Sequence, residues 1–283
     1  MEHKKINSFS ELTSINELMN YLDSAARLKD SNYVYQYTNI SSFISMMDSG
    51  TIHLCNAKYM NDQLEYNNGD ERLWKDLFFT CFMLEDEESI GMWSMYAQPW
   101  RDGIKISIPK DVLRKWVSEV ERIEEIDLDS KKPTGRNIDN SNDFKVWLSA
   151  VAYTDADRIN RKKEAETLHW GTLKNQNFTF LNKYDALTGY LKDIAWAYEK
   201  EIRLKLKINR NHTFKRIAIK IPDYVINSMI ITPSPLFDGD FKEALETKIQ
   251  KHFETKDSTF KGKLTLKDKC SDCSLKGRYD NEQ

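Results

Sequence analysis

Two glutamates and an arginine occupy alternate positions in the stretch WAYEKEIRLKLKI, residues 196–208. Successive side chains of an extended strand point to opposite faces, so Glu199, Glu201 and Arg203 are expected to share one face. Two carboxylates beside each other repel, which tends to raise the pKa of one of them. Such a pair is suited to proton transfer or to binding a divalent metal ion.

A solvated strand face is the simplest alternative. The other side of the stretch carries Tyr198, Lys200, Ile202, Leu204 and Leu206, an alternation typical of a half-buried strand with a polar outer side. The residues alone favour this interpretation. The repulsion between the glutamates argues against it, as does the aromatic segment IAWAY before them, which would wall one side of a cleft.

Other motifs for chemistry are weak. The five histidines never fall at metal-ligand spacing, and Cys270 and Cys273 form a lone CxxC, for which a surface turn is the favoured interpretation. The sequence has no Walker loop, no GxGxxG and no nucleophile elbow. Trp93, Tyr96 and Trp100 form an aromatic cluster that would stack on a ring or, as is favoured, fill the core.

The composition indicates a soluble, cytoplasmic protein. Lys and Arg total 42 against 44 acidic residues, so nothing global favours wrapping nucleic acid. No run approaches membrane-spanning length, and the N-terminus lacks a signal-peptide core. The four scattered cysteines suit a reducing compartment.

Short strands mix with helices without regular alternation, which predicts an α+β fold rather than a doubly wound sheet. We expect an N-terminal helical segment (1–30, with a helix at 14–28), a single α+β domain (31–253) and a C-terminal strand and polar tail (254–283). Within the domain, the polar stretch 124–143 has no period and is expected to be a mobile insertion. Expected elements include a strand at 33–38, a helix from Ile40 capped by Asn39 and ended by Gly50, a strand at 146–154 and a helix around 183–196.

The order of motifs from residue 33 to about 235 resembles a large bacterial family known only as a domain of unknown function. The motifs are a Tyr-x-Tyr-Thr-type start, an Asn-Asp loop, a Cys-Phe strand, Met-Trp-x-x-Tyr-Ala and Trp-x-x-Glu-x-Glu-x-Arg. This resemblance implies kinship and no particular chemistry.

The same layout distantly resembles the ADP-ribosyltransferases. Their first strand carries His-x-Thr or a related triplet, where this chain has Gln36, Tyr37 and Thr38, with glutamine in place of the usual histidine or arginine. Their last strand carries Glu-x-Glu, here Glu199 and Glu201. The resemblance implies an ADP-ribosyltransferase-like fold with a mixed, mainly antiparallel sheet and flanking helices.

The same resemblance implies NAD as substrate, no metal, and a role for each motif residue. Glu201 would hold the ribose 2′-hydroxyl and stabilise an oxocarbenium-like state, and Glu199 would orient or deprotonate the acceptor. Arg203 would pair with the phosphates or fix the glutamates. The remaining contacts to NAD would come from Gln36, Tyr37, Thr38, Asn61, Asp62, Trp93 and Tyr96.

Three functions follow as expectations. The first is an ADP-ribosyltransferase or NAD glycohydrolase in phage defence or toxicity, acting on nucleic acid, protein or water and working with an antitoxin or defence partner, away from membranes. The second is a non-catalytic module that binds a nucleotide, nucleic acid or protein. The third and weakest is a magnesium-dependent nuclease that uses Asp62, Glu65, Glu199 and Glu201.

Overall fold

The computed structural model describes six parts of the chain: residues 32–59, 74–84, 87–140, 142–154, 189 and 191–264. Several expectations lie outside these parts: the helix at 14–28, Asn61 and Asp62, Glu65, most of the helix around 183–196, and the cysteines Cys270 and Cys273.

The described elements are strands and short helices in irregular order, and β5 to β9 follow one another with no described helix between them. In chain order they are β1 (Tyr33–Asn39), α2 (Ile40–Ser49), β2 (Thr51–Asn56), η2 (Ala57–Tyr59), β3 (Leu77–Met83), α4 (Ile90–Tyr96), η4 (Trp100–Asp102), β4 (Gly103–Pro109), α5 (Lys110–Ser118), β5 (Ile123–Ile126), β6 (Pro133–Ile138), β7 (Phe144–Ala150), β8 (Ala152–Thr154), β9 (Leu191–Asp193), η5 (Ile194–Glu199), β10 (Glu201–Ile208), β11 (Arg216–Lys220), α8 (Asp223–Ile226), β12 (Ile230–Pro233), α9 (Phe241–Ile249) and β13 (Glu254–Thr255). The η elements are 3₁₀ helices.

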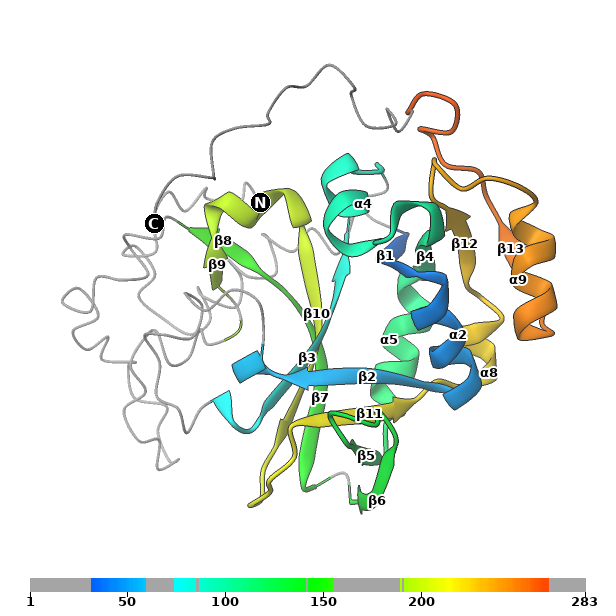
Figure 1. Ribbon diagram of the computed structural model, residues 1–283. Helices are drawn as coiled ribbons and strands as arrows, with labels where there is room; N and C mark the ends of the chain where they lie inside the picture. The colour runs from blue at the N-terminus through cyan, green and yellow to red at the C-terminus, as the bar shows by residue number, and fades with distance from the viewer. Residues whose placement is uncertain are drawn as a thin grey trace, which may run out of the picture.

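The strand β3 is the centre of the main sheet. On one edge β10 pairs with its whole length, and β7 pairs beyond β10. On the other edge, β1 pairs with β3 at Met83 while β2 pairs near Phe78 and Phe79, so two arms of the sheet leave the same strand. One arm continues to β4, β12 and β13, and the other to β11, β5 and β6. Figure 1 shows β2 and β11 running across the direction of β3, β10 and β7.

Within the described residues, every pairing of this sheet is antiparallel except that of β12 with β13. The prediction of an α+β fold with a mainly antiparallel sheet and a few helices is therefore confirmed. The predicted caps of α2 are also confirmed, because the Asn39 side chain accepts a hydrogen bond from the Ser42 amide and Gly50 ends the helix at φ 61°.

The two faces of the sheet are covered by different cores. Ile202, Leu204 and Leu206 of β10 belong to the large apolar core, which also holds Phe78 of β3 and Trp116 of α5. On the opposite face, Met92 and Trp93 of α4 pack against β1 and the end of β3. Those residues contact a smaller cluster made by Tyr35, Tyr37 and Met83.

Two segments have a different secondary structure from the predicted one. The polar stretch expected as an irregular insertion contains the hairpin of β5 and β6, because Ile123, Ile126 and Ile138 are buried in the core and the buried Glu125 binds Arg136. The described end of the helix expected around 183–196 is the strand β9 followed by η5. There Asp193 is extended, and its carboxylate caps the new helix by accepting a hydrogen bond from the Ala195 amide.

The strand expected at 146–154 is divided. β7 ends at Ala150, the buried Val151 donates its amide to the Glu201 carbonyl, and β8 then leaves the main sheet to pair in parallel with β9. This second, two-stranded sheet places Tyr153 and Lys192 beside the start of β10.

Replacing Asn39 with alanine should lower the free energy of unfolding by about 1–2 kcal/mol, since it removes the cap of α2. The same side chain also donates to the Gln98 carbonyl at 2.9 Å, which ties α2 to the end of α4. Urea denaturation measures the change. Ser45→Ala, on the exposed side of α2, is the control and should change the free energy by less than about 0.5 kcal/mol; equal effects would contradict the assigned cap.

Candidate functional site

The turn at Lys200 separates the two glutamates of the predicted strand. Glu199 is the last residue of η5 and Glu201 the first of β10, while Lys200 between them has a φ of 42°. The Leu84 amide donates to the Lys200 carbonyl at 3.0 Å and holds the turn against the end of β3. Strand alternation therefore begins at Glu201, and the left-handed residue brings Glu199 close to it.

The polar face of β10 is buried from Glu201 to Lys205, whereas Lys207 near the end of the strand is exposed. The exposed fractions are 3% for Glu199, 4% for Glu201, 0% for Arg203 and 1% for Lys205. The interpretation of this face as a solvated surface is wrong. Alternation in the sequence identifies which residues share a face, but it does not tell whether other polar groups lie over that face.

Glu201 is held by two groups of Arg203. The Arg203 Nε lies 2.7 Å from Oε1 and Nη2 lies 3.1 Å from Oε2, a two-pronged ion pair. The third nitrogen, Nη1, donates to the Gly189 carbonyl at 3.1 Å. The backbone amide of Glu201 donates to the Tyr153 hydroxyl at 2.8 Å. Arg203 thus fixes the carboxylate of Glu201, and Tyr153 fixes the backbone of the same residue.

Gly189 allows this arrangement because it is a glycine. Its φ is +74°, and an added Cβ would lie 2.6 Å from the Cζ of Phe79. The centroid of the same Phe79 ring lies 5.2 Å from the Arg203 guanidinium carbon, a cation–π contact. Any larger residue at 189 would push the chain away from the arginine.

Glu199 is held by a lysine and a tyrosine. The Lys192 Nζ lies 2.5 Å from Oε2 of Glu199 and 3.3 Å from Oε2 of Glu201, so one ammonium bridges both carboxylates. The Tyr96 hydroxyl donates a short hydrogen bond to Oε1 of Glu199. We call Tyr96, Lys192, Glu199, Glu201 and Arg203 the glutamate cluster. Its members come from α4, β9, η5 and β10; in Figure 1 the upper end of β10 lies between α4 on the right and β9 on the left.

The two glutamates differ in their acid strength. Burial alone would raise the pKa of Glu201, but the Arg203 guanidinium and the Lys192 ammonium together lower it to about 2. Burial raises the pKa of Glu199 above its usual value, although Lys192 and Tyr96 act against that rise. Two neighbouring carboxyl groups with opposite shifts can serve as a permanent anion and as a proton acceptor.

The structure brings together only part of the predicted NAD site. Tyr35 lies opposite Met83, which lies opposite Glu201, so the odd residues of β1 share the face of the glutamates. Gln36 and Thr38 lie on the other face. There the Gln36 amide contacts the Thr80 hydroxyl at 3.4 Å, away from the glutamate cluster.

The aromatic residues of the prediction divide as well. Tyr96 belongs to the glutamate cluster, whereas Trp93 is fully buried and fills the core, where it meets the edge of Tyr37 at a centroid distance of 4.9 Å. The Tyr37 hydroxyl accepts a hydrogen bond from the Ser89 amide. Tyr37 therefore shares the face of the glutamates but is engaged in packing α4.

Sequence reasoning missed Lys192 and Tyr153. Both lie in segments assigned to other elements, and no motif of residue types connects them to residues 199–203. It also missed Glu88, whose buried carboxylate binds the Trp93 indole, the Ser258 hydroxyl and the Thr259 amide, with Lys105 at 3.7 Å. Glu88 thereby fastens the segment after β13 to α4.

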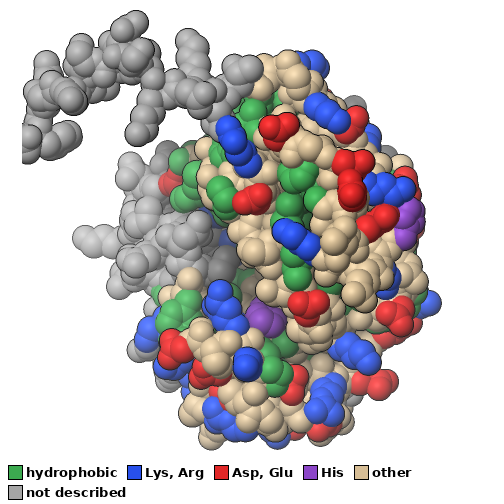
Figure 2. Space-filling model, turned by 45° about the vertical axis from the view of Figure 1, so that its right-hand side comes forward, with side chains coloured by type: hydrophobic (Ala, Val, Ile, Leu, Met, Phe, Trp, Pro, Cys, Tyr) green, Lys and Arg blue, Asp and Glu red, His purple; other side chains and the backbone are tan. Residues whose placement is uncertain are grey.

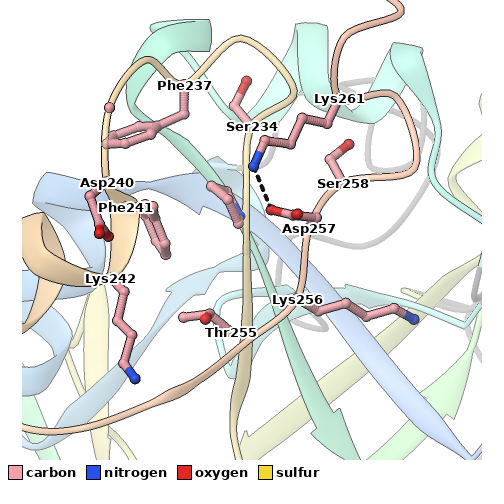
Figure 3. Close-up of a pocket in the computed structure, with 12 residues that line it drawn as sticks. Ser234, Phe237, Asp240, Phe241, Lys242, Thr255, Lys256, Asp257, Ser258 and Lys261 are labelled. Carbon is pink, nitrogen blue, oxygen red and sulfur yellow. Dashed lines mark hydrogen bonds and ion pairs between the residues drawn. The ribbon is translucent and has the colours of Figure 1, made fainter.

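A pocket of about 430 Å³ lies between the loop before α9 and the segment after β13 (Figure 3). Its lysines do not converge, because Lys242 and Lys256 point in different directions and Lys261 pairs with Asp257 at 2.8 Å. None of its lining residues belongs to the glutamate cluster. We assign it no role in the chemistry.

Surface charge and metal-binding groups give no competing site in the described parts of the chain. Acidic and basic side chains are interspersed on the face in Figure 2. Among the described residues, no group of three or more His, Cys, Asp or Glu side chains is arranged to hold a metal ion. Within the same residues, no helix has the length and apolar character needed to cross a membrane.

Comparison with known proteins gives one family model that matches part of the chain. Residues 92–204 match the model of a family described as a protein of unknown function (DUF2971). The match supports the expected kinship with an uncharacterised family, and it runs from α4 into β10, so it includes every member of the glutamate cluster. No curated protein and no solved structure matches the chain, and the resemblance to ADP-ribosyltransferases stays a prediction.

Replacing Arg203 with methionine should lower the free energy of unfolding by about 3–5 kcal/mol, because it leaves the buried Glu201 carboxylate without its main partner. Urea denaturation measures the loss. Arg210 is the matched control: its pair with Asp143 at 3.3 Å is partly exposed, so Arg210→Met should cost less than about 1 kcal/mol. Equal losses in the two variants would contradict the buried pair.

Acid should destabilise the wild-type protein through Glu201. Its pKa in the fold is about 2, below the ordinary 4.5, so its stabilising effect is present above about pH 4.5 and is lost as the pH falls toward 2. The loss should reach about 3 kcal/mol. The difference in unfolding free energy between wild type and Glu201→Gln, followed from pH 6 to 2, isolates this effect; a difference that does not change with pH would disprove it.

Proposed function

We propose that the protein is an NAD-using ADP-ribosyltransferase or NAD glycohydrolase whose reaction centre is the glutamate cluster. The observation that carries the proposal is the pair Glu199 and Glu201, buried side by side with pKa values shifted in opposite directions. The proposed biological role, defence against phage or toxicity in the cytoplasm, rests on the sequence resemblance.

The reaction would break the bond between the nicotinamide nitrogen and C1′ of the ribose. The bonding electron pair leaves with nicotinamide, and C1′ acquires positive charge in an oxocarbenium-like state. Glu201, which stays ionised, is suited to stabilise this charge and to hold the 2′-hydroxyl. Arg203 and the Tyr153 hydroxyl keep Glu201 in place through its side chain and its backbone amide.

Glu199 would complete the transfer. An oxygen or nitrogen of the acceptor forms the new bond to C1′ and gives up a proton, which the Glu199 carboxylate accepts. A raised pKa makes this carboxylate a stronger base than an ordinary glutamate. Water as acceptor gives a glycohydrolase, whereas a nucleophile of a nucleic acid or protein gives a transferase.

The NAD contacts expected from β1 are not part of the proposal. Gln36 and Thr38 lie on the face of the sheet opposite the glutamates, so they do not belong to the same site. This placement, together with the burial of both carboxylates, favours a second candidate: a module that binds a nucleotide, nucleic acid or protein without turnover.

The arrangement of charges argues against the metal-dependent nuclease. Two of its four expected ligands, Glu199 and Glu201, are within ion-pair distance of Lys192 or Arg203. Cations of the protein thus stand where a magnesium ion would have to bind.

The test is release of nicotinamide from NAD by the purified protein in the presence of a chelator. Glu201→Gln should reduce the rate by about 100-fold or more, because the charge on the reacting ribose loses its anion. Glu199→Gln should reduce transfer to the acceptor by about 100-fold or more. Glu125→Gln is the matched control, since Glu125 is also buried beside an arginine, and it should keep the wild-type rate.

Two results would separate the candidates. Equal rates in wild type and Glu201→Gln would disprove the assigned reaction centre. Binding of NAD or another nucleotide without turnover, in every preparation, would favour the binding module instead.

A further inference from the structure

Lys192 occupies the centre of the glutamate cluster. Its Nζ lies between the two carboxylates, 2.5 Å from Glu199 and 3.3 Å from Glu201, and only 2% of the residue is exposed. A buried ammonium at these distances interacts strongly with each carboxylate, because little water screens the charges.

The position of Lys192 is fixed by its own strand and by an aromatic ring. Lys192 lies in the middle of β9, opposite Tyr153 of β8, so the parallel pair of strands sets its backbone. Its ammonium lies 4.6 Å from the centroid of the Trp196 ring, a cation–π contact.

The other titratable groups around Glu199 come from every neighbouring element. Tyr96 of α4, Tyr153 of β8, Tyr198 of η5 and Glu201 of β10 interact with Glu199 itself. Cys81 of β3 and Arg203 of β10 interact with Glu201, and Lys200 follows Glu199 at the turn. The Arg203 Nε lies 2.7 Å from Oε1 of Glu201, whereas the Lys192 Nζ lies 2.5 Å from Oε2 of Glu199. The charge of Glu199 therefore depends on Lys192 more directly than on the arginine.

From this geometry we infer that Lys192 is a positioning residue: it holds Glu199 ionised and turned toward the reacting centre, so that this carboxylate accepts the proton of the acceptor. The inference rests on the proposed function and assigns the lysine a role that Arg203 does not fill. Arg203 secures the permanent anion Glu201, and Lys192 secures the base Glu199.

Removing the Lys192 ammonium should change the pH dependence of the reaction. Without the ammonium, burial and the negative charge of Glu201 act on Glu199 with less opposition, so its pKa rises further. The base form then disappears at a higher pH. In hydrolysis of NAD, Glu199 takes the proton of the attacking water, so the acid limb of kcat/KM for this reaction, followed as nicotinamide release, should move up by about one to three pH units in Lys192→Met.

The experiment compares Lys192→Met, Lys192→Arg and the control Lys105→Met. Lys105 is also a buried lysine close to a glutamate, at 3.7 Å from Glu88, but it is not a member of the glutamate cluster. Two quantities are measured on each folded variant: the pH profile of nicotinamide release, and the titration of the Glu199 carboxyl carbon by NMR in protein labelled with ¹³C-glutamate. The Glu199 signal is assigned by its loss in Glu199→Gln.

In Lys192→Met, both the acid limb and the Glu199 titration should move to higher pH, while Lys192→Arg restores them and Lys105→Met leaves them as in wild type. An unchanged Glu199 titration in Lys192→Met would overturn the inference. The NMR titration needs no turnover. If wild type released no nicotinamide but the titration moved as expected, the proposed function would fail while the control of Glu199 by Lys192 would stand.

Discussion

The buried ion pair of Glu201 and Arg203 is the constraint on which the rest of the site depends. A charged carboxylate and a guanidinium can stay inside a sheet protein only if the remaining hydrogen-bonding groups of each are also satisfied. Here the Gly189 carbonyl accepts a hydrogen bond from the arginine and the Phe79 ring contacts it. The Lys192 ammonium forms a second ion pair with the Glu201 carboxylate. The short parallel sheet of β8 and β9 exists beside β10 and supplies two of these partners, Tyr153 and Lys192.

This constraint also explains the turn at Lys200. A regular strand through residues 199–203 would place Glu199 two residues further along the same face than Glu201, beyond Met83 at the end of β3. The left-handed conformation of Lys200 instead ends η5 and starts β10 in one step. Both carboxylates consequently reach one ammonium, and their environments become unequal.

The fold could be predicted from the sequence where local chemistry determines structure. Asn39 and Gly50 mark the ends of α2 because capping depends on nearby backbone groups. The hairpin of β5 and β6 could not be predicted, since its strands are defined by burial: Ile123 and Ile138 pack against distant elements in the large core, and Ile126 is buried as well. For the site, the alternate positions of Glu199, Glu201 and Arg203 predicted that these three residues lie together. Tyr96 was among the predicted site residues, but Lys192 and Tyr153 were not, because the short parallel sheet of β8 and β9 that positions them has no signal in the sequence. The face on which Gln36 lies depended on the register of β1 with β3. The match to a family of unknown function covers the whole glutamate cluster but not β1.

The central claim is that the glutamate cluster is where NAD binds and reacts. Carboxyl-carbon NMR of ¹³C-glutamate-labelled protein tests it most directly, with Glu199 and Glu201 assigned by glutamine substitution and NAD added in steps. The account predicts that these two signals shift together as NAD binds, while the signal of the equally buried Glu125 stays in place. Signals of Glu199 and Glu201 that remain unchanged at saturating NAD would contradict it and leave the cluster as a structural ion pair.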